Sequence, residues 1–104
     1  MTNVLVKFDE PITDASGARY FAQALGRKRE EDGLWEGWLE FLATGDGAIP
    51  IDSGRETTQP NRADLEYWAQ GLTKAYLQGA LVRAQSPTDA IRRDRSARES
   101  GRDI

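Results

Sequence analysis

The chain has 104 residues, of which 30% are charged and 38% hydrophobic, and its formal net charge is −3. A chain of this length forms one domain with one modest core. It contains no cysteine and no histidine, which excludes disulfides, thiolate metal sites and serine–histidine or cysteine–histidine catalysis. The negative balance makes nucleic acid a poor partner. No apolar run approaches the roughly 20 residues that span a membrane. We therefore expect no membrane partner, no signal peptide and a cytoplasmic protein.

The first two predicted strands precede a tight turn. Residues 3–8 are rich in valine and alternate in polarity, which predicts a strand with one side toward the core. The core side should carry Val4, Val6 and Phe8. Residues 18–29 fit either a helix or a strand. We prefer a strand because Glu31-Asp32-Gly33 predicts a three-residue hairpin loop directly after them. Gly26 should then leave room for a tryptophan ring across the ladder.

Residues 34–42 alternate most regularly and should form the central strand. One face is apolar throughout: Trp35, Gly37, Leu39 and Phe41. The other face mixes Trp38 with Glu36 and Glu40, which is typical of a half-exposed surface. The basic run at residues 27–29 meets the acids at residues 30–32 at the hairpin tip, where we expect the charges to neutralise each other.

A second turn, marked by Gly45 and Gly47, leads to the edge of the sheet. Pro50 restricts the short extended piece at residues 49–51 to an edge position, because proline cannot donate to the strand ladder. Residues 52–59 are polar throughout, and we interpret them as a linker between the sheet and the helices.

Two apolar stripes of helical period follow Pro60, for which Thr58 or Gln59 is the predicted cap. The first stripe is Leu65, Trp68, Ala69 and Leu72, and the second is Tyr76, Leu77, Ala80, Leu81 and Ala84. Gly71 is placed to end the first helix, and Thr73 to cap the second.

These segments predict an α+β domain over residues 1–84. Its sheet is an antiparallel meander of three to four strands, flat or curled toward a small barrel, followed by a two-helix hairpin. Residues 85–104 form an arginine-rich, charged tail with few large apolar side chains. We expect this tail to be mobile, because it cannot bury enough surface to offset the entropy of ordering.

The polar segment at residues 54–62 is the main candidate for a binding site. Its candidate ligand-binding residues are Arg55, Glu56, Thr57, Thr58, Gln59, Asn61 and Arg62. Free amides at a helix start attract anions, and Arg55 and Arg62 could clamp a phosphate or carboxylate. The competing interpretation is that the segment only caps the helix and orders a turn. Anion binding would make the protein a non-enzymatic binding or accessory domain, with a protein or a small anionic ligand as partner.

Two other functions stay open on sequence grounds. Glu36, Glu40 and Glu56 belong to a set of acids that could serve glycoside chemistry or bind a hard cation. The alternative is therefore a small carbohydrate-active or metal-assisted enzyme that uses Glu40 and Glu56. The tail allows a third hypothesis, a nucleic-acid adaptor, which the acidic balance opposes. The leading hypothesis names no catalytic residue, no metal site and no cofactor.

Three motifs lie within residues 34–84: a Trp-Glu-Gly-Trp strand, a Gly-Arg-Glu-Thr-Thr-Gln-Pro-Asn segment and a Tyr-Trp-Ala helix. In these motifs the chain resembles a family of small uncharacterised bacterial proteins of unknown function. The resemblance implies a stand-alone cytoplasmic domain, and it supplies no activity and no site residue.

Overall fold

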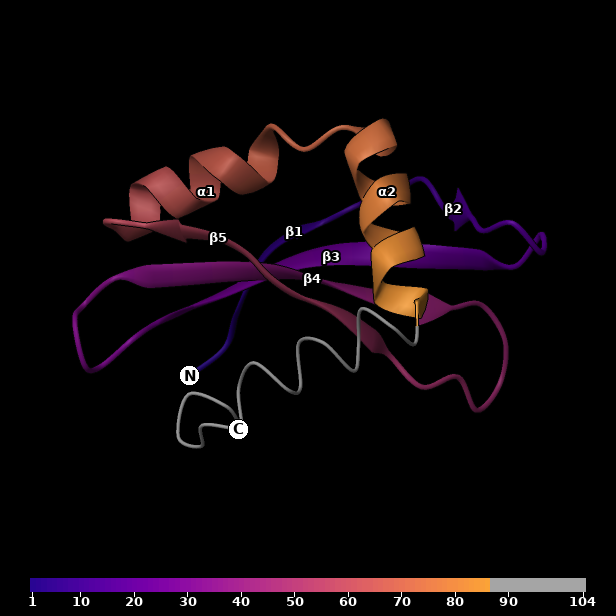
Figure 1. Ribbon diagram of the computed structural model, residues 1–104, viewed down its shortest axis with the longest axis horizontal. Helices are drawn as coiled ribbons and strands as arrows, with labels where there is room; N and C mark the ends of the chain where they lie inside the picture. The colour runs from indigo at the N-terminus through magenta and orange to yellow at the C-terminus, as the bar shows by residue number, and fades with distance from the viewer. Residues whose placement is uncertain (87–104) are drawn as a thin grey trace, which may run out of the picture.

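The structure, a computed structural model, describes residues 1–86. Its elements are β1 (Asn3–Lys7), β2 (Ile12–Thr13), β3 (Arg19–Lys28), β4 (Trp35–Ala43), β5 (Ile51–Gln59), α1 (Arg62–Gln70) and α2 (Lys74–Gln85). All strand pairs are antiparallel, in the order β1-β3-β4-β5, and β2 pairs with the first residues of β3. Both helices lie on the same side of an open sheet (Figure 1). The predicted α+β meander with a helical pair is confirmed, without closure into a barrel. The predicted mobile tail lies, from residue 87 onward, outside the residues that the structure describes.

The ambiguous segment is the strand β3, as predicted. Its register with β4 is continuous from Tyr20 opposite Ala43 to Lys28 opposite Trp35. The connecting loop contains Gly33 with a φ of +74°, a conformation that favours glycine. This segment forms a strand rather than a helix because it pairs with neighbours on both sides, β1 and β2 on one side and β4 on the other.

Small side chains on β3 and β4 let the helices approach the sheet. Gly26 pairs with Gly37, and a Cβ built on Gly26 would lie 2.4 Å from Cδ2 of Leu65 in α1. The occupant of this space is thus a leucine, whereas the sequence pattern predicted a tryptophan ring. Trp68 lies instead against Gly37, where a Cβ would be 2.8 Å from its Cζ3. The predicted apolar face of β4 is confirmed, because Leu39 and Phe41 are buried in the core. The same core contains Ala22, Ala24, Ala69, Leu77, Ala80 and Leu81.

An irregularity in β1 corrects the first strand's predicted faces. Val4 pairs with Leu25 and Val6 with Ala24, so Leu5 is an extra residue on β1. The bulge turns Val4 away from the core, and it is 50% exposed. Leu5, Val6 and Phe8 pack against the core. The prediction was therefore wrong for Val4, because strict alternation does not hold across a bulge.

The predicted linker at residues 52–59 is the edge strand β5, with two bulges. At the first bulge, the Ser53 hydroxyl accepts the Leu39 amide at 3.0 Å and donates to the Gly54 carbonyl at 2.7 Å. Gly54 has a φ of +81°, which only glycine adopts readily. The linker interpretation was wrong because an edge strand needs few apolar residues, and bulges also protect its free edge from further pairing.

The strand extends to Gln59, so α1 begins later than predicted. Asn61 is its cap and accepts the Asp64 amide at 2.8 Å, which corrects the prediction of Thr58 or Gln59. Gly71 at the end of α1 and Thr73 at the start of α2 are confirmed as caps. Neither helix in residues 1–86 is long and apolar enough to cross a membrane.

Candidate functional site

The structure places the two arginines of the predicted anion clamp on different faces of the sheet. Arg55 pairs with Trp38 across β4 and β5. Arg62 begins α1, where its guanidinium lies 5.8 Å from the Trp35 ring centroid and its Nε lies 3.0 Å from Glu66. Trp35 and Trp38 are three residues apart on a regular strand, so they point to opposite faces. The two guanidinium groups therefore do not converge on one ligand.

Glu56 is committed to the contact between β5 and α2. It is the extra residue of the second bulge, and its side chain is 8% exposed. The Tyr76 hydroxyl donates to its carboxylate, and Arg83 Nη2 lies 2.8 Å from the same oxygen. Partial burial and then the bond to Glu56 raise the pKa of Tyr76. Glu56 thus fastens α2 to the edge strand.

The other predicted site residues also have local roles. Asn61 caps α1, and the Gln59 amide donates to the Thr57 hydroxyl at 2.7 Å. The Thr57 methyl group lies in front of Gly37 on the helix side. Thr58 pairs with Glu36 and is exposed. Five of the seven residues therefore have structural contacts toward the helices, and anion binding by residues 54–62 stays a prediction.

The carboxylates considered for catalysis are separated in the same way. Glu40 accepts a hydrogen bond from the Gln23 amide on the face away from the helices. Glu56 points to α2 on the helix side. Within residues 1–86, no three acidic side chains are grouped so that they could hold a metal ion.

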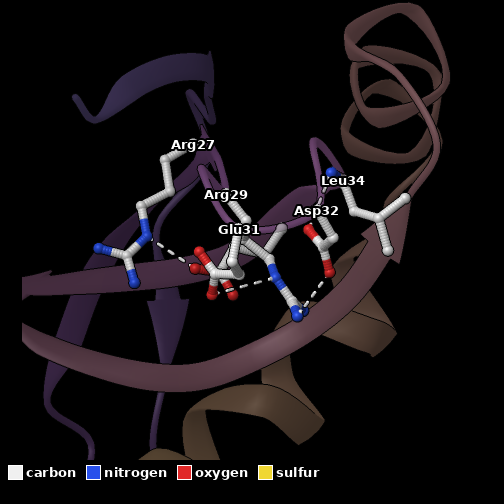
Figure 2. A network of polar contacts seen from close by, with 6 residues as sticks. Arg27, Arg29, Glu31, Asp32 and Leu34 are labelled. Carbon is white, nitrogen blue, oxygen red and sulfur yellow. Dashed lines mark hydrogen bonds and ion pairs between the residues drawn. The ribbon is translucent and has the colours of Figure 1, made fainter.

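The β3–β4 hairpin tip behaves as predicted for a self-compensated charged turn. Arg29 Nη2 lies 2.8 Å from Asp32, and Arg29 Nε lies 3.8 Å from Glu31. The second oxygen of Asp32 accepts the Leu34 amide at 3.1 Å. Figure 2 shows these side chains paired around the loop. Arg29 is therefore paired with its own acidic neighbours, whereas Arg27 of the same run pairs with Glu36 on β4.

The face opposite the helices is the best candidate surface. Among residues 1–86 no helix or strand covers it (Figure 1). We call it the open face and define it by four cross-strand rows. These are the Arg27 row (Arg27, Glu36, Thr58), the Trp38 row (Val4, Leu25, Trp38, Arg55), the Glu40 row (Lys7, Gln23, Glu40, Asp52) and the Phe21 row (Phe21, Leu42).

Apolar and charged groups alternate along the open face. Phe21 and Leu42, which are paired neighbours, are 43% and 44% exposed. Arg27 Nε lies 2.7 Å from Glu36, and the Arg27 guanidinium lies 5.9 Å from the Trp38 ring centroid. Sequence reasoning noticed the mixed face of β4 but missed the surface as a whole. The surface was missed because residues 52–59 were interpreted as a linker. Without β5, the residues of β4 on this face have no cross-strand partners on that side.

Comparisons with protein-family models, with curated proteins and with solved structures find no match. The candidate surface therefore rests on the geometry of the chain itself.

Proposed function

We propose that the protein is a non-enzymatic interaction domain that binds another protein through the open face. The observation that carries the proposal is the pair of exposed large side chains, Phe21 and Leu42, which are direct cross-strand neighbours on an uncovered sheet. Isolated apolar residues are ordinary on protein surfaces, whereas a contiguous patch marks a site of interaction. Val4, half exposed in the Trp38 row, adds apolar surface on the other side of the Glu40 row.

The chemistry of the open face favours a protein over a nucleic acid. Its cations are Lys7, Arg27 and Arg55, and its acids are Glu36, Glu40 and Asp52. A phosphate backbone needs an excess of positive charge, which this face does not have. Aromatic residues and arginine are enriched in protein–protein interfaces, and Arg27 stacked over Trp38 provides both.

Site-specific photo-crosslinking tests the proposal. Benzoylphenylalanine replaces Phe21 on the open face or, as the matched control, Tyr67 on the outer side of α1, which is 82% exposed. Both variants are irradiated in the cells that naturally produce the chain. We expect a discrete protein adduct from position 21 and none from position 67. An absence of adducts at position 21, or equal adducts at both positions, would overturn the proposal.

A further inference from the structure

We infer that the partner bound by the open face is a second copy of this chain. The two copies are related by a two-fold axis that runs parallel to the strands, over the line between β3 and β4. This inference rests on the proposed function and names its partner. It is carried by the chemistry of the cross-strand rows, which are self-complementary about that axis.

The axis has a simple consequence for the strands. Rotation by half a turn about a line along the strands places β3 of one copy over β4 of the other, and β1 over β5. Each residue of β3 then faces the partner subunit's copy of its own neighbour on β4, each residue of β1 faces the β5 residue of the same row, and every row faces itself. Such an interface is isologous, so each favourable contact occurs twice.

The two rows nearest the hairpin tip fit this arrangement. Arg27 faces Glu36 of the partner subunit, and the two ion pairs together form a ring of alternating charges. Networks of this kind contribute more than isolated surface pairs. In the next row, Leu25 faces Trp38 of the partner subunit. Leu25 is only 6% exposed, so the contact in this row is made mainly by the partly exposed Trp38 ring, and aromatic rings are common anchors in interfaces.

The remaining rows are complementary too. Phe21 faces Leu42 of the partner subunit, which removes from water the most exposed apolar pair of β3 and β4. Gln23 faces Glu40 of the partner subunit, an amide donor against a carboxylate. At the outer strands, Lys7 faces Asp52 of the partner subunit, again with opposite charges. No row places like charges opposite each other. The one apolar residue that faces a charge is Val4 on the outer strand, which faces Arg55 of the partner subunit.

A two-fold axis across the strands does not have this property. It would exchange the Arg27 row with the Phe21 row, and would place Arg27 and Glu36 on Phe21 and Leu42. Covering charges with apolar side chains is unfavourable. The balance of signs on the open face also disfavours a strongly acidic or strongly basic partner. The rows therefore select both the occupant and the direction of the axis.

Sedimentation of the purified full-length chain from micromolar to millimolar concentration tests the inference. We expect a monomer–dimer equilibrium. Arg27→Glu and Glu36→Arg should each weaken dimerisation by about tenfold or more, because each places like charges across the axis. An equimolar mixture of the two variants should restore dimerisation, because residue 27 of either chain then faces an opposite charge on the other. Lys74→Glu, on the exposed first turn of α2, is the matched control and should have no effect.

A monomer at all concentrations would overturn the inference, as would variants whose mixture does not restore the dimer. Circular dichroism verifies that each variant is folded. If a charge reversal prevents folding, Phe21→Lys and Leu42→Glu replace the two variants. Each alone should weaken dimerisation, and their equimolar mixture should restore it, because the new lysine of one chain then faces the new glutamate of the other. Crosslinking separates the two proposals. An adduct between position 21 and a different protein would leave the proposed function standing and overturn self-association.

Discussion

On the covered face of the sheet, the cross-strand neighbours Gly26 and Gly37 are small, and Leu65 and Trp68 of α1 fill the space above them. On the open face, Arg27 and Glu36 in the adjacent positions are long and of opposite charge. The same two strands supply both surfaces, because successive side chains point to opposite sides. Under the proposed function, stability and recognition are divided between the two faces. Substitutions on the covered face should unfold the domain, and those on the open face should change what it binds.

The largest expected difference is between two phenylalanines. Phe41→Ala removes a fully buried ring from the covered face and should cost about 3–5 kcal/mol of unfolding free energy. Phe21→Ala on the open face should cost less than about 1 kcal/mol in dilute solution, because its ring is partly hydrated. Chemical denaturation at low protein concentration measures both values. Equal losses would contradict the division between the faces.

Two glycines should respond to alanine with opposite signs. A Cβ on Gly37 would lie 2.8 Å from both Leu65 and Trp68, so Gly37→Ala should destabilise the protein by about 1–3 kcal/mol. Gly79 in α2 has room, since its nearest neighbour is Arg83 at 3.7 Å. Gly79→Ala should therefore stabilise the helix by about 0.5–1 kcal/mol. Thermal and urea unfolding give both signs, and a neutral Gly37→Ala would show that α1 docks less closely.

Glu56 sharpens the comparison at the edge of the covered layer. Glu56→Gln removes the charge that Arg83 and Tyr76 hold between β5 and α2, and should cost about 1–2 kcal/mol. Glu66→Gln is the matched control, because Glu66 also pairs with an arginine but is 44% exposed. It should cost less than about 0.5 kcal/mol. Hydrogen exchange should show faster opening of α2 only in Glu56→Gln, and unchanged protection there would contradict the role of Glu56.

Asp14 makes the same layer sensitive to acid. The hydrogen bond from Gln85 and then that from Ser16 lower the pKa of Asp14 from its ordinary value of 3.8 to about 2. Asp14 therefore stabilises the fold fully above its ordinary pKa, and this contribution is lost as the pH falls toward 2. Gln85→Leu should raise the pKa toward the ordinary value and reduce the acid-dependent loss. NMR titration of the Asp14 carboxyl group in both proteins measures the change in pKa caused by Gln85→Leu, and this change should be absent if Gln85 does not contact Asp14 in solution.

The smallest effects are expected at the two arginines of the predicted anion site. Arg62→Gln removes an exposed pair with Glu66 and should cost less than about 0.5 kcal/mol. Arg55→Gln should leave stability unchanged. If residues 54–62 bind an anion, phosphate should raise the melting temperature at matched ionic strength. The single variant that loses this phosphate effect then identifies the face of the sheet on which the anion binds. No phosphate effect on the unmodified protein would rule out the anion site.

Much of the fold was predictable because its signals are local. The alternation in residues 34–42, the hairpin turn at Gly33 and the helix caps Gly71 and Thr73 depend on near neighbours in the chain. The candidate site was not predictable in the same way. The segment containing Arg55 is polar whether it is a linker or an edge strand, and only the edge strand completes the rows of the open face.

The sequence by itself determined the strands β1, β3 and β4, the two helices that follow the sheet, the apolar side of β4 and the apolar stripes of both helices. Each of these follows from the periodicity of side chains along one element. The tertiary structure alone decided the bulges at Leu5, Ser53 and Glu56, because a bulge is a mismatch between two paired strands and has no signal within either one. It also decided which side of the sheet the helices cover. Glycine on both β3 and β4 lets α1 approach that side closely, and the charged rows are therefore left on the other.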